Sequence, residues 1–157
     1  MNQNKLFKRF IGTWDFQRTI RSQRKNTVSG VVIGVASITE MDQTTLYYQE
    51  KGVFTTNLGD KTNIHREYIY KYCPREKKIE KFFSINGSLD RLFYLLLFKL
   101  NTNQQDIKAE AFHLCNQDRY EAEYTFFDGE LFENFSLMYR VAGPKKAYTS
   151  ETMFKKF

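Results

Sequence analysis

Three charged residues, Arg18, Glu50 and Arg66, lie on strand faces that are otherwise apolar. Charged side chains at such positions can bind a ligand or take part in a reaction inside a protein. Side chains along an extended strand alternate between its two faces. Each charge shares its face with apolar or aromatic residues: Trp14, Phe16 and Ile20 beside Arg18; Leu46, Tyr48 and Phe54 beside Glu50; and Ile64, Tyr68, Tyr70 and Tyr72 beside Arg66. Because an apolar face packs toward the core, we expect all three charges to point inward.

An inward-pointing arginine needs a partner, because a buried guanidinium without one is strongly destabilising. Glu50 can pair with one of the two arginines, which leaves Asp118, at the start of a later strand, as the other candidate acid. An arginine without an acid partner can bind a carboxylate or phosphate through two parallel hydrogen bonds. The alternative is a closed network of Arg, Glu and Tyr that only specifies the strand register.

His113 is the other residue whose type suggests chemistry. A neutral imidazole can ligate haem iron or a metal, or act as a catalytic base, but it can also simply line a pocket. The second histidine, His65, falls on the outward face of its strand, and no HxH, HExxH or CxxC spacing is present. Cys73 and Cys115 are too few and too far apart for a metal quartet. We therefore expect a pocket-lining His113, with no metal and no cofactor.

The elements that must position these residues are short strands. Strand-like runs fall at about 14–21, 30–40, 45–55, 62–72, 77–84, 91–100, 106–115, 119–127, 131–142 and 147–156, and Asn4 to Phe10 reads as a short helix. Asn86-Gly87 and Asp128-Gly129 are typical of tight hairpins. The inward face of 106–115 stays open between Ala109, Ala111, His113 and Cys115 and the alternative of Glu110, Phe112 and Leu114. About ten antiparallel strands predict an all-β, up-and-down barrel rather than a sandwich, because closure removes exposed edges.

Composition is consistent with one small-molecule-binding domain over residues 1–157. Aromatic residues make up 17% of the chain, which favours sheets and the wall of a cavity. The net charge is +6, but the basic residues are interleaved with eighteen acids, so we expect no specific nucleic-acid binding. The N-terminus lacks the apolar core of a signal peptide, and the most apolar run, 92–97, is too short to cross a bilayer. These features predict a cytoplasmic protein without a transmembrane segment.

Several stretches carry a family resemblance in their order along the chain. They are Gly12-Thr13-Trp14-Asp15-Phe16-Gln17-Arg18, Gly34-Val35-Ala36, Tyr48-Gln49-Glu50-Lys51-Gly52, Arg66-Glu67-Tyr68, His113-Leu114-Cys115-Asn116-Gln117-Asp118-Arg119-Tyr120 and Val141-Ala142-Gly143-Pro144-Lys145-Lys146-Ala147-Tyr148. This set resembles a lipocalin-like family known as a domain of unknown function. The resemblance implies a calycin-type barrel in which Trp14 plugs one end of an internal cavity. It also implies a shared set of polar residues: Arg18, Glu50, Arg66, His113, Asp118, Tyr120, Lys146 and Tyr148.

We predict that the barrel binds a small, partly apolar anion. Arg18 and Arg66 would hold the acid group, and Glu50 and Asp118 would orient the arginines. Hydroxyl groups would come from three tyrosines: Tyr68, Tyr120 and Tyr148. One alternative is a lyase or isomerase in the same barrel, which a strongly shifted pKa of Glu50 or a tyrosine beside an open cavity would favour. Another is contact of the amphipathic ends, residues 6–10 and 153–157, with nucleic acid or membrane.

Overall fold

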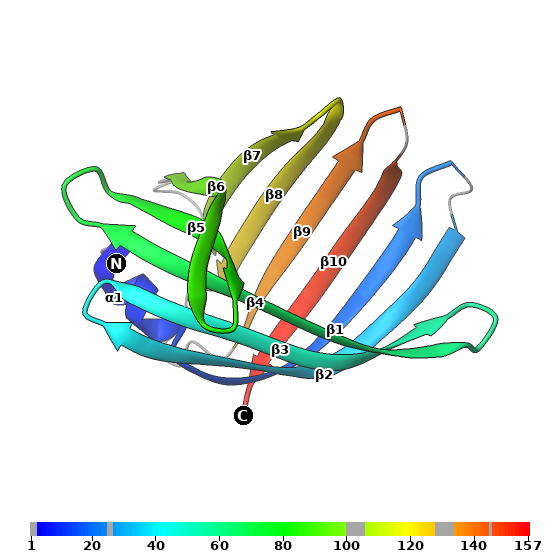
Figure 1. The fold of residues 1–157 in the computed structure, drawn as a ribbon, viewed down its shortest axis with the longest axis horizontal. Coiled ribbons are helices and arrows are strands. Elements are labelled where there is room, and N and C mark those ends of the chain that lie inside the picture. The colour runs from blue at the N-terminus through cyan, green and yellow to red at the C-terminus, as the bar shows by residue number, and fades with distance from the viewer. Residues whose placement is uncertain (1–2, 25–26, 100–105, 128–133, 145) are drawn as a thin grey trace.

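The chain folds into a closed barrel of ten antiparallel strands with one short helix (Figure 1). The computed structural model describes residues 3–24, 27–99, 106–127, 134–144 and 146–157. The elements are α1 (Gln3–Arg9), β1 (Gly12–Ser22), β2 (Thr27–Asp42), β3 (Thr45–Thr56), β4 (Lys61–Cys73), β5 (Lys78–Ile85), β6 (Ser88–Lys99), β7 (Asp106–Cys115), β8 (Asp118–Phe127), β9 (Asn134–Ala142) and β10 (Ala147–Lys156). The predicted all-β barrel is confirmed.

Each strand pairs with its neighbour in the sequence, and β1 pairs with β10 to close the barrel. Strand ends differ slightly from the sequence prediction: β2 begins at Thr27 and β6 at Ser88. The predicted Asn86-Gly87 hairpin is confirmed, since both residues have positive φ, 50° and 80°. The predicted Asp128-Gly129 turn lies outside the described residues.

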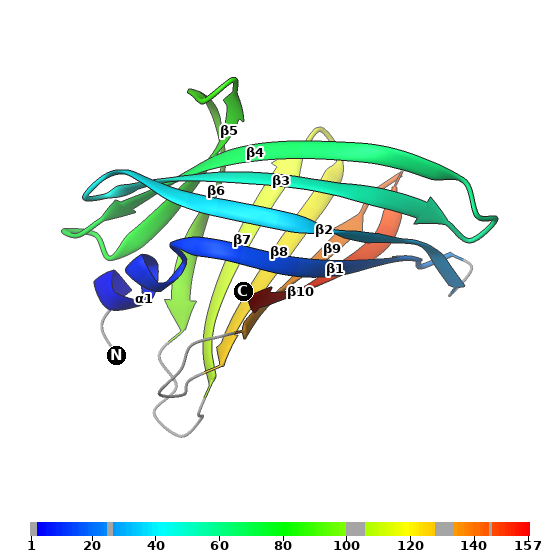
Figure 2. The same ribbon diagram turned by 90° about the horizontal axis from the view of Figure 1, so that it is seen from below.

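One end of the barrel is filled by aromatic side chains and covered by α1 (Figure 2). Trp14 is fully buried, its Nε1 donates a hydrogen bond to the carbonyl oxygen of Phe10 at 2.9 Å, and its ring packs edge-on against Phe135. On the helix, Leu6 and Phe7 point into the core. The apolar part of the N-terminal segment is therefore used in folding, which weighs against the alternative in which it contacts nucleic acid or membrane.

The opposite end of the barrel is open. There the paired ends of β3 and β4 diverge from those of β7 and β8 (Figure 1). The described pairing between β6 and β7 is short and covers residues 97–99 against 108–110. A groove of about 770 Å³ is lined by residues of β6 and β7, together with residues of β8 and β9.

Replacing Gly87 with alanine is expected to destabilise the protein by about 1 kcal/mol, because a β-carbon disfavours the positive φ of this turn. A β-carbon at Gly87 would meet no neighbouring atom, so the cost is one of backbone conformation. Urea unfolding measures it. The matched variant Gly87→Asn should lose less stability, since asparagine tolerates this conformation better. Equal losses in the two variants would contradict this explanation.

Candidate functional site

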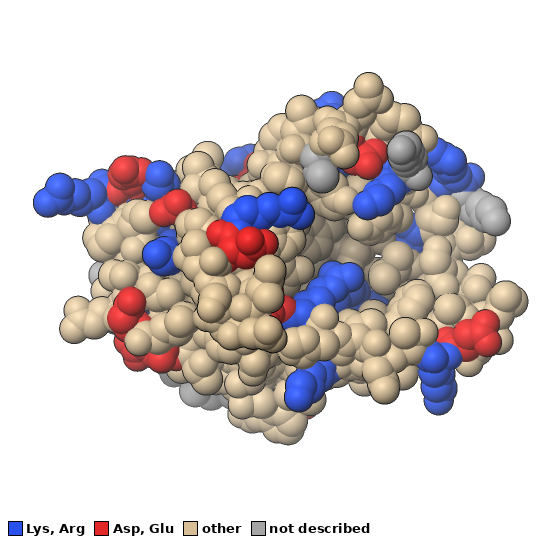
Figure 3. Space-filling view, viewed as in Figure 1, with Lys and Arg blue, Asp and Glu red and all other residues tan. Residues whose placement is uncertain are grey.

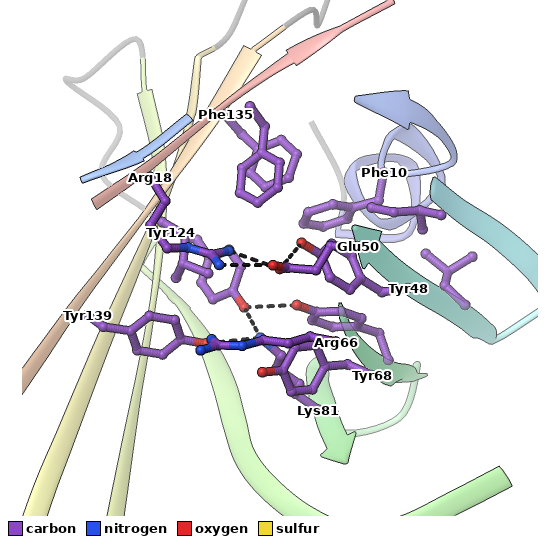
Figure 4. A pocket seen from close by; sticks show the side chains of 15 residues that line it. Phe10, Arg18, Tyr48, Glu50, Arg66, Tyr68, Lys81, Tyr124, Phe135 and Tyr139 are labelled. Carbon is purple, nitrogen blue, oxygen red and sulfur yellow. Dashed lines mark hydrogen bonds and ion pairs between the residues drawn. The ribbon is translucent and has the colours of Figure 1, made fainter. Parts of the chain in front are cut away.

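The centre of the barrel holds a buried ion pair between Arg18 of β1 and Glu50 of β3 (Figure 4). The two Nη atoms of Arg18 each donate to one carboxylate oxygen at 2.9 Å, and Nε donates to Oγ1 of Thr152 at 2.8 Å. Glu50 also accepts a hydrogen bond from the hydroxyl of Tyr48 at 2.7 Å. All three guanidinium nitrogens of Arg18 are thus occupied by the protein itself.

This pairing keeps Glu50 ionised. Burial acts to raise the pKa of Glu50, but the hydrogen bonds and charge of Arg18 outweigh it and hold that pKa below its ordinary value. Burial raises the pKa of Tyr48 well above its ordinary value, so its hydroxyl stays protonated and can donate to the carboxylate. Neither group is thereby poised to exchange a proton near neutral pH, which weighs against these two residues as an acid–base pair.

Arg66 is the second predicted interior arginine, and it differs from Arg18 in exposure and pairing. It lies directly opposite Glu50 in the register of β3 and β4, but Glu50 is taken by Arg18. Arg66 forms no ion pair with any residue that the structure describes, and it is exposed at the open end. Its side chain therefore carries a charge that the protein leaves available to an anion.

Two cavities lie on either side of Arg66. The inner cavity, lined by the Arg18–Glu50 pair and the core aromatics, has a volume of about 20 Å³ and has room for about one water. The outer cavity, at the open end, has a volume of about 440 Å³. Four residues line both cavities and so form the floor of the outer one: Arg18, Arg66, Tyr68 and Tyr139.

The lining of the outer cavity is cationic and aromatic. Its charged side chains are those of Arg18, Arg66, Arg91 and Lys146, and no aspartate or glutamate belongs to the described lining. Figure 3 shows Lys and Arg side chains in and beside a hollow of this face. One wall consists of stacked rings, with Phe83 and Phe93 centroids 4.5 Å apart. Such a cavity attracts an anion and can bury a planar apolar group beside it.

Most of the predicted site residues meet at this outer cavity. Beside the two arginines, its lining includes Tyr68, His113, Tyr120, Lys146 and Tyr148. Glu50 lines the inner cavity instead. The open question about β7 is answered by burial, since Ala109 and Ala111 are buried whereas Phe112 and Leu114 are mostly exposed. His113 therefore faces inward, and its ring lies edge-on to Phe93 at 5.3 Å.

Asp118 takes a position different from the one expected for it. It forms no ion pair with a described arginine, so the orienting acid in this structure is Glu50. Asp118 instead packs against Gly143, where a β-carbon would approach its Cα to 2.8 Å. Nearby, Nζ of Lys146 donates to the hydroxyl of Tyr120 at 3.2 Å, and this bond raises the pKa of Lys146.

Lys81 is the residue that the site prediction missed. It is 2% exposed, and its Nζ donates to the hydroxyls of Tyr94, Tyr124 and Tyr139 at 3.0, 3.1 and 3.0 Å. The alternation Ile79, Lys81, Phe83 is the signal that could have found it, since it has the same form as the alternation around Arg18.

Among the described residues, no group of three or more His, Cys, Asp or Glu side chains is placed to hold a metal ion. No described helix combines the length and the apolar character needed to cross a bilayer.

Comparisons with known proteins identify the family and the fold. A search of curated proteins finds no match. Among solved structures, an S-type phycobiliprotein lyase from Guillardia theta superposes with a TM-score of 0.69 at 9% identity, over 100% of this chain and 93% of that one. A de novo designed fluorescence-activating β-barrel gives 0.43 at 12% identity, over 96% and 95%. The lyase likeness concerns the fold alone. A family model described as "Family of unknown function (DUF6314)" matches residues 10–156, and the chain therefore belongs to that family.

Proposed function

We propose that the protein binds a small, partly apolar anion in the outer cavity. The observation that carries this proposal is a cavity of about 440 Å³ whose described charges are all positive. Pockets of this size bury most of a small organic molecule. Cys73 is a free thiol, which suits the cytoplasmic location that we propose with this function.

The acid group of the ligand would be bound by cations that have no acid partner. Arg66, Arg91 and Lys146 form no ion pair with a described residue, whereas Arg18 is fully engaged by Glu50 and Thr152. We therefore assign the main contact to Arg66, which can offer a bidentate fork from the cavity floor. Arg18, whose charge is balanced by Glu50, then holds the floor in place rather than contacting the ligand.

The apolar part of the ligand would lie against the stacked aromatic wall. The ring of Phe93 stacks on Phe83 and, at 6.3 Å and 9°, on Tyr139. Arg91 stands 5.0 Å from the Phe83 ring centroid, so the same wall also carries a charge at its edge. A flat ligand with an acid group at one end fits this combination of rings and cations.

Arg66→Ala is expected to weaken binding of phenyl phosphate or benzoate by about tenfold or more, because a hydrogen bond to a charged group is worth about 1.5–3 kcal/mol. Isothermal titration calorimetry measures the affinity, and native mass spectrometry of the purified protein tests for a co-purified acid. Lys146→Ala should weaken binding as well, since it also removes a cation from the cavity lining.

Arg75→Ala serves as the matched control. Arg75 is exposed in the turn between β4 and β5, outside the cavity lining, so this variant removes the same charge elsewhere. It should leave the affinity unchanged. If Arg66→Ala and Arg75→Ala weaken binding equally, the anion is attracted by net charge rather than by this site, and the proposal is wrong.

A further inference from the structure

Lys81 is surrounded by tyrosines from several strands rather than by acids. Besides its three hydroxyl partners, the ring of Tyr68 lies 4.1 Å from Nζ. The hydroxyls bond to one another, with Tyr94 2.7 Å from Tyr124 and 2.6 Å from Tyr139. A neutral amine can donate to two of these hydroxyls and accept a hydrogen bond from the third, so the cluster satisfies it without supplying a negative charge.

Burial disfavours the ammonium form of Lys81 more strongly than the nearby charge of Glu50 favours it. The charged groups that act on it are Glu50, Arg18 and Arg66, and Glu50 is already paired with Arg18. No described carboxylate forms an ion pair with Lys81. Burial therefore lowers the pKa of Lys81 well below its ordinary value. A buried lysine in this state is far more nucleophilic at neutral pH than an exposed one.

The amine also lies next to the proposed binding cavity. Lys81 lines the inner cavity, whose other lining residues Arg66, Tyr68 and Tyr139 also form the floor of the outer cavity. In the close-up, Lys81 lies near Tyr68 (Figure 4). Tyr68 and Tyr139 contact Nζ and also line the outer cavity, so the carbonyl group of a ligand reaches the amine when these side chains move aside.

We propose that Lys81 forms an imine with an aldehyde or ketone whose anionic group is held by Arg66 and Lys146 at the open end. The inference rests on the proposed function and extends it by naming a carbonyl group as the second feature of the ligand. The part of the ligand between the carbonyl group and the acid group would then pack against the aromatic wall.

The reaction balances without an oxidant or reductant. The lone pair of Nζ attacks the carbonyl carbon, and the carbonyl π electrons move to oxygen, which takes up a proton. The resulting carbinolamine loses its hydroxyl as water, and the products are one imine and one water. The hydroxyls of Tyr94, Tyr124 and Tyr139, all within 3.1 Å of Nζ, can pass the protons between nitrogen and oxygen.

The test is trapping of the imine with 4-formylbenzoate and sodium cyanoborohydride, followed by peptide mapping by mass spectrometry. We expect Lys81 to be the preferred site of modification, and the rate of labelling to reach its plateau below pH 10.5, the ordinary pKa of a lysine. Lys81→Met should lose the adduct. The matched control Lys51→Met, which removes an exposed lysine of β3, should keep it. Labelling of exposed lysines with Lys81 unmodified would overturn the proposal.

A second probe separates this inference from the proposed function. Methyl 4-formylbenzoate presents the same aldehyde without the charge, and we expect it to label Lys81 about tenfold or more slowly, because the charged contact is lost. Equal labelling by the two probes would overturn the anion site while leaving the reactive amine. Reversible binding of 4-formylbenzoate that depends on Arg66 but never modifies Lys81 would overturn the imine and leave the anion site.

Discussion

Glu50→Ala is expected to destabilise the protein by roughly 3–5 kcal/mol, because it leaves the guanidinium of Arg18 buried without its counter-charge. Arg18 is 6% exposed and Glu50 is 1% exposed, so the pair is largely shielded from bulk solvent. Only the bond from Nε of Arg18 to Thr152 would remain of the three that its guanidinium donates. The free energy of unfolding in urea measures the effect.

Two controls separate the buried pair from charge in general. Glu40→Ala removes a carboxylate from the exposed pair with Lys8 and should cost less than about 1 kcal/mol. The double variant Arg18→Met/Glu50→Leu removes both buried charges and should recover most of the loss, since apolar replacement of a whole buried pair is often neutral. A double variant as unstable as Glu50→Ala would show that the hydrogen bonds, rather than the unpaired charge, carry the stability.

The Arg18–Glu50 pair was predictable because strand alternation is a local property. Trp14, Phe16 and Ile20 fix the inward face of β1, and Leu46 and Tyr48 fix that of β3, whatever the rest of the fold does. The choice of Arg18 over Arg66 as the partner of Glu50 was not predictable in this way. Arg66 is the direct cross-strand neighbour of Glu50, yet the pair forms between β1 and β3, on either side of β2, which depends on how the sheet curves.

The outer cavity could not be predicted from the sequence. Alternation places Arg66 on the inward face, but it does not say that the barrel is open at that level and leaves the side chain exposed. The register shifts of β5 against β6 at residues 81–84 and the short pairing of β6 with β7 also set the shape of this region. Such irregularities interrupt the strand alternation on which the sequence prediction rests.

Lys81 was predictable as an inward charge, but its surroundings were not. Ile79 and Phe83 mark the face on which it lies, as the neighbours of Arg18 do. No sequence pattern shows that Tyr94, Tyr124 and Tyr139, from three other strands, converge on one amine. The two interior cations therefore differ in their partners: Arg18 is paired with a carboxylate, whereas Lys81 is hydrogen-bonded only to hydroxyls among the described residues.

Lys81→Met is therefore expected to stabilise the protein at pH 7 by at least about 1 kcal/mol, since each unit by which burial lowers a pKa is worth about 1.4 kcal/mol. Methionine keeps a similar length and removes the cost of burying the amine, while the tyrosine hydroxyls retain their bonds to one another. Urea unfolding of the two proteins at the same pH gives the difference directly.

The difference should depend on pH in a defined direction. The pKa of Lys81 is lowered in the folded state, so between that value and the ordinary 10.5 the unfolded chain binds a proton that the folded chain does not. Wild-type stability relative to Lys81→Met must then rise with pH across that window, and the penalty is complete below the lowered pKa. We expect the advantage of Lys81→Met to shrink from about pH 7 to about pH 9.5, before most tyrosines ionise. A constant advantage over this range would mean that Lys81 keeps its proton on folding, and a nucleophilic amine at this position would then be excluded.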